Sequence, residues 1–340
     1  IKKAISHLAQ VRVEVEDILK DKNILIGETG WPSEGRMRED AMPSKINQAL
    51  FVREFVKLAE EKNWNYNIIE AFDQPWKRVS EGAVGGFWGL FDKDRLDKNV
   101  FTGDVSNFPN YKYLGFGSLL LIFGFSFLLK NSNISTKRVV LFSFINTIFA
   151  VLYMLQMEQF NITVRSSGEV VWATLVLLTH LAIYYFVLLN IAKESKPKIV
   201  GIREILANKV FNIDTLPMVL FYSSFIFVLI STIILAFEGR YRNFEIYIFA
   251  ISTISFVLLY GGRFANMEFK AFEKLSFIVL LITSIISFYN EGSLNIFSNI
   301  WIIIALIFTY ILFQGSKNSS FSELKIIAKY IAIFFIFSIS

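Results

Sequence analysis

Glu28, Asp73 and Gln74 are the side chains of this sequence best placed to do chemistry. Glu28 follows the short apolar run 24–27, and Asp73 and Gln74 follow a second run. Tryptophans stand beside both positions, at Trp31 and Trp76. Carboxylates perform the acid/base and nucleophilic steps of glycosidases, and aromatic rings offer broad apolar faces to sugar rings. The pattern favours a sugar-binding cleft, while a loop charge beside packing tryptophans is the alternative interpretation.

Alternating helices and strands must position these side chains. Helical spacing of apolar residues predicts helices over 5–20 and 44–62, with Ser44 as the N-cap of the second. Apolar runs predict strands at 24–27 and 67–72, and a short segment, 86–91, closes the domain. The order helix, strand, helix, strand predicts an α/β unit with parallel strands. In such units functional residues lie on loops at the carboxyl ends of strands, so both loops open on one face.

The rest of the chain has the composition of a membrane protein. Residues 1–112 carry 17 basic and 18 acidic groups, whereas the remainder carries 17 and 11, and the mean hydropathy of the chain is +0.48. Runs without charge are long enough, or nearly so, to cross a bilayer. We expect an all-α bundle of seven or eight transmembrane helices. The runs are 113–129, 139–157, 170–192, 215–237, 246–262, 275–290, 292–316 and 330–340.

The charges between these runs predict their orientation. The connections after the odd-numbered runs hold 14 Lys and Arg residues, and those after the even-numbered runs hold only 3. By the positive-inside rule the odd connections face the cytoplasm, and residues before Tyr113 lie outside it. We therefore expect an integral protein of a bacterial inner or plasma membrane with its polar part extracytoplasmic.

Composition also excludes several kinds of site. The sequence has no cysteine and two histidines, His7 and His180, so thiolate chemistry and a three-His zinc site are excluded. We expect no cofactor and no bound metal. The basic excess lies in the membrane part, so we attribute it to topology and expect no nucleic-acid partner.

Three motifs, in order, resemble glycoside hydrolase family 17, the β-1,3-glucanase family. Ile26–Ser33 resembles its nucleophile motif, and Glu70–Lys77 with Glu81, followed by Gly86–Phe91, is similar to its last strand and closing segment. The resemblance covers roughly residues 1–95. It implies the last quarter of a (β/α)₈ barrel, around strands seven and eight.

The resemblance implies roles for individual residues. Glu28 stands where the family has its catalytic nucleophile, and a retaining mechanism would form a glycosyl-enzyme intermediate on it. Lys77 and Glu81 match polar positions near that nucleophile, and a neighbouring ammonium would favour the ionised form of Glu28. The substrate-binding residues that the resemblance implies are Trp31, Asp73, Gln74, Trp76, Lys77 and Glu81. Gln74 is an amide where many members have a carboxylate.

The family's general acid/base glutamate has no counterpart here, because it lies after strand four of the barrel. The chain also begins at Ile1 and ends inside an apolar run. We expect a fragment, inactive by itself, of a longer enzyme. Its expected domains are 1–95, the C-terminal portion of the barrel; 96–112, a linker; and 113–340, the membrane region.

The leading hypothesis is a membrane-anchored retaining glycosidase or transglycosylase that acts on β-glucan. Multi-span bacterial proteins that resemble this arrangement make or remodel β-1,3/1,6-glucans, so glucosyl transfer is as plausible as hydrolysis. The expected partners are a β-glucan or oligosaccharide, the lipid bilayer and envelope polysaccharide-synthesis proteins. The alternatives are a non-catalytic glucan-binding protein and a glucan exporter.

Overall fold

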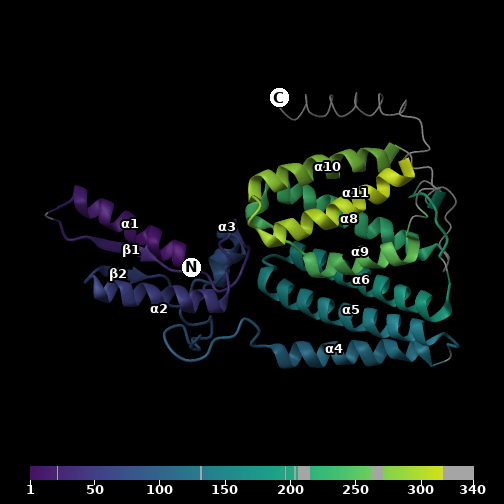
Figure 1. The fold of residues 1–340 in the computed structure, drawn as a ribbon, viewed down its shortest axis with the longest axis horizontal. Helices are drawn as coiled ribbons and strands as arrows, with labels where there is room; N and C mark the ends of the chain where they lie inside the picture. The colour runs from purple at the N-terminus through teal and green to yellow at the C-terminus, as the bar shows by residue number, and fades with distance from the viewer. Residues whose placement is uncertain are drawn as a thin grey trace. The chain divides into compact units, whose positions relative to one another are not determined.

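The computed structural model describes residues 1–20, 22–130, 132–195, 197–202, 204–205, 215–261, 263 and 271–316. These residues form two compact units. The N-terminal unit consists mainly of Ile1–Tyr111, and the helical unit consists of most of the described chain from Lys112 onward. Figure 1 labels the elements of both units.

A β-α-β arrangement forms the centre of the N-terminal unit. Strand β1 (Leu25–Thr29) pairs in parallel with β2 (Asn65–Ile68), and helix α2 (Lys45–Glu61) makes the crossover between them. Helix α1 (Lys2–Ile18) precedes β1. The predicted α/β unit with parallel strands is confirmed. A sheet of two strands within the described residues does not establish a barrel.

Both strands differ from the predicted runs. β1 extends to Thr29, so Glu28 lies within the strand and not after it, because Thr29 still pairs with Ile68 across the ladder. β2 begins two residues earlier than predicted, at Asn65 opposite Leu25. Apolar runs mark buried side chains, whereas backbone pairing sets the ends of a strand. The positions at 70–72 pair with another segment, described below.

Helix α2 supplies the core of this unit. Ser44 caps it, because the Ser44 hydroxyl accepts a hydrogen bond from Asn47 N at 3.1 Å, as the sequence predicts. Phe51 and Phe55 are buried, and Tyr66 of β2 meets Phe55 edge-on with ring centroids 5.1 Å apart. Leu50 of the same helix is exposed, because the face that packs is centred on Phe51 and Phe55.

Residues beyond position 95 also pack in this core. Val100 is buried in the cluster with Phe55, and Arg53 of α2 donates hydrogen bonds to the carbonyls of Asn99, Val100 and Gly103. Residues 99–103 therefore contact this core, although they lie beyond the domain boundary that we predicted at residue 95.

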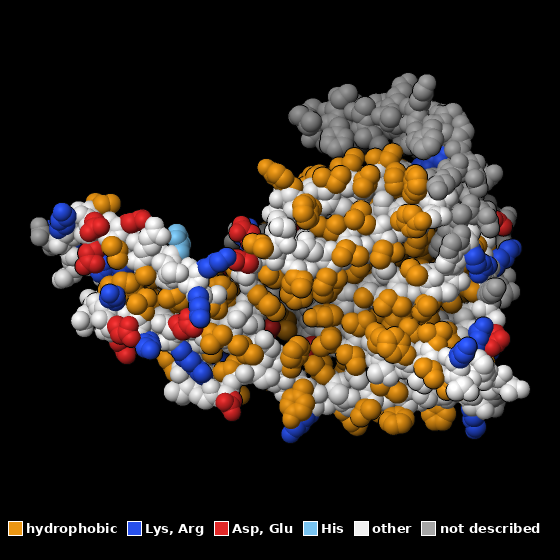
Figure 2. Space-filling view, in the orientation of Figure 1, with side chains coloured by type: hydrophobic (Ala, Val, Ile, Leu, Met, Phe, Trp, Pro, Cys, Tyr) orange, Lys and Arg blue, Asp and Glu red, His pale blue; other side chains and the backbone are white. Residues whose placement is uncertain are grey.

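The helical unit contains seven long or medium helices within the described residues. They are α4 (Tyr111–Ser126), α5 (Thr136–Thr163), α6 (Ser167–Lys193), α8 (Leu216–Phe237), α9 (Ile246–Tyr260), α10 (Ala271–Glu291) and α11 (Ile296–Ser316). Short 3₁₀ turns add Phe127–Leu129 after α4 and Gly239–Tyr241 after α8. Figure 2 shows hydrophobic side chains spread over the visible face of this unit.

Six of these helices are long and apolar enough to cross a membrane, fewer than the seven or eight that we predicted. The fifth predicted span is the shorter helix α9, which ends at Tyr260. The eighth, 330–340, lies outside the described residues. The sixth is longer than its charge-free run, because α10 begins at Ala271 and includes Glu273, whose carboxylate accepts a hydrogen bond from Tyr222 at 3.0 Å.

Replacement of Phe55 by alanine should loosen the N-terminal core. Phe55 is fully buried, so Phe55→Ala should cost about 3–5 kcal/mol, from lost burial and the cavity left behind. Hydrogen exchange of the α2 amides in the detergent-solubilised chain measures this loss. Ile46→Ala on the same helix is the control, because Ile46 is 38% exposed and should leave exchange nearly unchanged. Equal effects of the two substitutions would contradict this core.

Candidate functional site

Glu28 is the penultimate residue of strand β1, and a Gly-Trp-Pro-Ser loop follows the strand. It is exposed, next to the buried Thr29. Gly30 follows, where an added Cβ would stand 2.5 Å from the carbonyl oxygen of Ile69. The tight approach of the two strand ends therefore requires glycine at position 30, and it brings the loops after β1 and β2 close together.

Glu70 joins a lysine and a glutamine in the segment that follows β2. The turn Pro75–Lys77 leads into the short helix α3 (Arg78–Glu81). Lys77 Nζ donates to Glu70 Oε1 at 2.7 Å, and Gln74 donates through its amide to the other oxygen of Glu70. Glu70 thus holds Lys77 and Gln74 in place through both of its oxygens.

The surrounding charges act on Lys77. The hydrogen bond that Lys77 donates to Glu70 raises the pKa of Lys77. Burial opposes this shift, and Coulombic attraction to Glu70, Glu81 and Glu28 adds to it. Lys77 is therefore a stable positive charge within electrostatic reach of Glu28.

Asp73 lies in a different set of contacts. Lys98 Nζ is 3.0 and 3.2 Å from the two carboxylate oxygens of Asp73, and it also donates to Ser33 Oγ at 2.8 Å and to the Gly89 carbonyl at 2.6 Å. Gly89 N donates to Asp73 Oδ1 at 2.9 Å. Burial raises the pKa of Asp73 and lowers that of Lys98, while their mutual attraction opposes both shifts. These contacts engage the Asp73 carboxylate within the fold.

The segment Phe87–Phe91 runs beside the residues after β2. Glu70 N donates to Trp88 O at 3.0 Å, and Leu90 N donates back to Glu70 O at 2.8 Å. A Cβ added at Gly89 would overlap the backbone of Phe72, Asp73 and Phe91. The close parallel approach of these two segments therefore requires glycine at this position.

Two further side chains fasten the same segment. Gln48 of α2 is buried, and its amide donates to the carbonyls of Trp88 and Gly89 at 3.2 and 3.0 Å. On the other side Ser33 N donates to Phe87 O at 2.8 Å. The segment 87–91 thereby ties the loop after β1 to the loop after β2.

The two tryptophans of the predicted cleft differ in environment. Trp31 packs against Phe51 with ring centroids 5.7 Å apart, and its indole N–H donates to Met42 O at 3.0 Å. Trp76 is 68% exposed, and Lys77 Nζ lies 5.8 Å from its ring centre. The ring of Trp76 is therefore largely exposed next to Lys77, whereas the ring of Trp31 packs partly against the core of the unit.

The structure brings some predicted residues together and separates others. Lys77, Glu81 and Glu28 form one electrostatic group, to which Gln74 is linked through Glu70. Asp73 belongs to the Lys98 group. Sequence reasoning did not assign roles to Glu70, Lys98 and Gln48. Glu70 is the first residue of the motif Glu70–Lys77, so the motif could have indicated a role for it. Lys98 lies in the predicted linker, 96–112, and Gln48 lies on a predicted helix, where no motif marks either residue.

A metal site finds no support in the part of the chain that the structure describes. No group of three or more His, Cys, Asp or Glu side chains there could hold a metal ion.

The comparisons with known proteins match the N-terminal unit. The BtgE/BtgC glycoside hydrolase domain matches residues 1–89. A glucan 1,3-beta-glucosidase of Saccharomyces cerevisiae is 37% identical over 75 residues, which cover 21% of this chain and 23% of the relative. A probable beta-glucosidase btgE of Aspergillus fumigatus is 32% identical over 85 residues, which cover 25% of this chain and 14% of the relative.

A solved structure is also similar. It is an active-site mutant of the Rhizomucor miehei beta-1,3-glucanosyltransferase in complex with laminaritriose, with 24% identity, 30% of this chain and 36% of that chain covered, and a TM-score of 0.27. The chain spans about a quarter or less of the length of the two curated relatives named above. The N-terminal part of the chain is glycoside hydrolase family 17-like and homologous to β-1,3-glucosidases.

Removal of Lys98 should release the segment 87–91. Lys98→Met leaves the mostly buried Asp73 carboxylate without its cation, which should cost about 3 kcal/mol. Exchange of the Leu90 and Phe91 amides should accelerate about a hundred-fold. Lys93→Met removes an exposed ion pair with Asp94 and should change little.

A second substitution tests the reason for that effect. Asp73→Asn in the Lys98→Met background keeps an oxygen for Gly89 N but removes the unpaired charge, so part of the protection should return. Unchanged exchange in Lys98→Met would contradict the role given to this pair.

Lys77 should stabilise the N-terminal unit in a pH-dependent way. Its folded pKa is raised above the ordinary 10.5, so its contribution is complete below that pH and is lost as the pH rises through the folded value. The difference in Tm between wild type and Lys77→Met should be constant from about pH 6 to 9 and shrink above about pH 10.5. Lys57→Met, on the exposed side of α2, controls for loss of one positive charge. A difference that vanishes already near neutral pH would refute this assignment.

Proposed function

We propose that this chain is part of a membrane-anchored retaining β-glucan glycosidase or transglycosylase. The observation that carries the proposal is the group formed by Glu28, Lys77 and Glu70 inside a segment that matches a glycoside hydrolase domain. The names of the relatives, which include glucan 1,3-beta-glucosidases, support β-1,3-glucan as the substrate class.

In this proposal Glu28 is the nucleophile. A carboxylate oxygen of Glu28 attacks the anomeric carbon, the glycosidic bond to the leaving sugar breaks, and a covalent glycosyl-enzyme forms. A general acid protonates the leaving oxygen, and the same group, then a base, activates the next acceptor. We propose that this acid/base residue comes from outside residues 1–340. Water as the acceptor gives hydrolysis, and a sugar hydroxyl gives transfer.

The remaining site residues position the nucleophile and the sugar. Glu70 acts as a positioning residue, because it holds the Lys77 ammonium within reach of Glu28. The exposed ring of Trp76 supplies a face on which a sugar ring stacks. We propose that Gln74 and Glu81 also contact the sugar. We propose that Asp73 acts on the substrate only through the loop that it holds, since Lys98 and Gly89 engage its carboxylate.

We further propose that residues 1–95 form the C-terminal portion of a (β/α)₈ barrel and 113–340 a membrane region. The contacts of Lys98 and Val100 support assigning the first part of the connecting segment, 96–112, to the same domain as residues 1–95. Six helices that are long and apolar enough to cross a membrane support the anchoring. The charge pattern supports an extracytoplasmic barrel portion. We propose a bacterial inner or plasma membrane, with envelope polysaccharide-synthesis proteins as partners, on the resemblance to multi-span bacterial glucan proteins alone.

Substitution of Glu28 tests the enzymatic proposal. Membranes that contain the full-length protein should shorten or elongate laminari-oligosaccharides, and Glu28→Gln should lower formation of both kinds of product by at least about 10³-fold, because no intermediate forms. Mass spectrometry of the products measures this change. Glu54→Gln, on α2 and away from the cluster, is the matched control and should keep full activity.

The wild-type products separate the two reactions, since longer oligosaccharides require transfer to a sugar. Wild-type protein that binds glucan without converting it would contradict the enzymatic proposal and favour a binding protein. Activity that survives Glu28→Gln would refute Glu28 as the nucleophile.

A further inference from the structure

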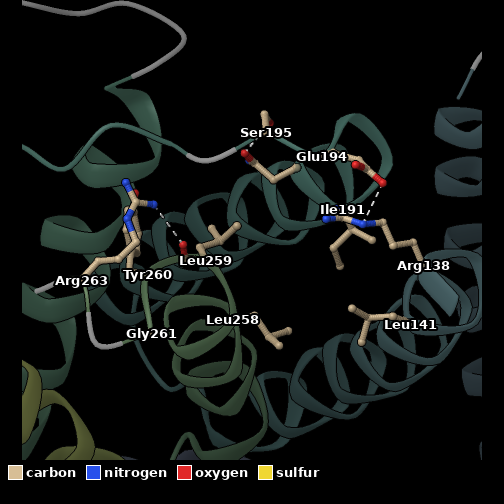
Figure 3. A pocket seen from close by; sticks show the side chains of 11 residues that line it. Arg138, Leu141, Ile191, Glu194, Ser195, Leu258, Leu259, Tyr260, Gly261 and Arg263 are labelled. Atoms are coloured by element: carbon tan, nitrogen blue, oxygen red, sulfur yellow. Dashed lines mark hydrogen bonds and ion pairs between the residues drawn. The ribbon is translucent and has the colours of Figure 1, made fainter. Parts of the chain in front are cut away.

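A pocket of about 630 Å³ opens at one end of the helical unit (Figure 3). The start of α5 contributes Arg138, the end of α6 contributes Glu194, and the end of α9 together with the residues after it contributes Leu258 and Arg263. None of these residues belongs to the glycosidase-like site. The pocket is therefore a separate feature that the proposed function does not explain.

The pocket has one excess positive charge among its described lining residues. Arg138 Nε lies 2.8 Å from Glu194 Oε1, so these two charges offset each other. Arg263 donates to the carbonyls of Pro197 and Leu259 at 3.1 and 3.5 Å, and among the described residues it makes no ion pair. Backbone carbonyls do not neutralise a guanidinium, which retains its charge and further N–H donors.

Apolar side chains form the other wall of the pocket. Leu141 of α5 and Leu258 of α9 line it and are 38% and 43% exposed. In Figure 3 both leucines lie below the ion pair of Arg138 and Glu194. An anionic head beside an apolar tail matches this division of the lining.

The chain segments that meet here share one predicted side of the membrane. Arg138, Glu194 and Arg263 belong to the first, third and fifth connections, all of which the charge pattern places in the cytoplasm. The cytoplasmic leaflet carries anionic lipids, and basic pockets between transmembrane helices on that side bind acidic headgroups.

We propose that this pocket binds the headgroup of an anionic phospholipid. The phosphate contacts Arg263, whose charge no described carboxylate of the lining offsets, and an acyl chain lies along Leu141 and Leu258. Arginine suits this role because its fork of N–H donors matches phosphate oxygens. The headgroup would bridge α5, α6 and α9 and anchor this end of the bundle in the cytoplasmic leaflet.

Native mass spectrometry of the purified chain in neutral detergent tests the proposal. Wild-type protein should retain one phosphatidylglycerol in preference to phosphatidylcholine with the same acyl chains. Arg263→Gln should weaken phosphatidylglycerol binding about five-fold, as removal of one arginine near the headgroup should. Arg138→Gln should weaken it at least as much, because Glu194 then remains in the pocket uncompensated.

Matched variants separate this site from general charge and from misfolding. Lys137→Gln removes an exposed cation next to Arg138, outside the pocket lining, and should leave binding within two-fold of wild type. Arg263→Lys keeps the charge and should retain most of the binding. Equal retention of both lipids, or equal loss in Lys137→Gln and Arg263→Gln, would overturn the proposal. Displacement of the lipid by inorganic phosphate at equal concentration would show a free-anion site and overturn the lipid assignment.

Discussion

The contact on which the N-terminal unit depends is the ammonium of Lys98 among four oxygens. Its partners are both oxygens of Asp73, the hydroxyl of Ser33 and the carbonyl of Gly89. One side chain therefore joins the loop after β1, the loop after β2 and the segment beside them. Burial disfavours the charged forms of both Asp73 and Lys98. Removal of either side chain alone would therefore leave the other as an unpaired buried charge, which is costly.

The charged group on the functional side is built on that framework. Glu70 lies just after β2, where two backbone hydrogen bonds to the segment 87–91 fix its position. Its carboxylate accepts a hydrogen bond from Lys77. Lys77 lies in the electrostatic field of Glu28 and Glu81. The result is an exposed carboxylate near the end of β1 in the electrostatic field of Lys77, and the exposed ring of Trp76 lies beside Lys77.

Sequence patterns located the elements but not the contacts between them. The β-α-β order, the Ser44 cap and the apolar helices followed from periodicity and capping, which are local properties. The end of β1 and the roles of Glu70 and Lys98 depend on hydrogen bonds between distant segments, and no local pattern records those. Asp73 illustrates the difference: its type and position suggested a ligand to sugar, while a lysine 25 residues away engages it.

In the helical unit, the charges of the connections bear on the pocket. Alternation of basic and neutral connections predicted which helix ends share a side, and the ends of α5, α6 and α9 that line one pocket are among those predicted to face the cytoplasm. The charge-free run 275–290 is shorter than the helix, because α10 begins at Ala271 and so includes Glu273 and Lys274.

The most direct test of the account is to trap the sugar on its nucleophile. A 2-deoxy-2-fluoro glucosyl donor with a dinitrophenolate leaving group needs no general acid, so it isolates the step assigned to Glu28. Peptide mass spectrometry of the treated full-length protein should find the fluorosugar on Glu28, and Glu28→Gln should remain unlabelled. A label on another carboxylate, such as Glu81 or Glu70, would contradict the assignment.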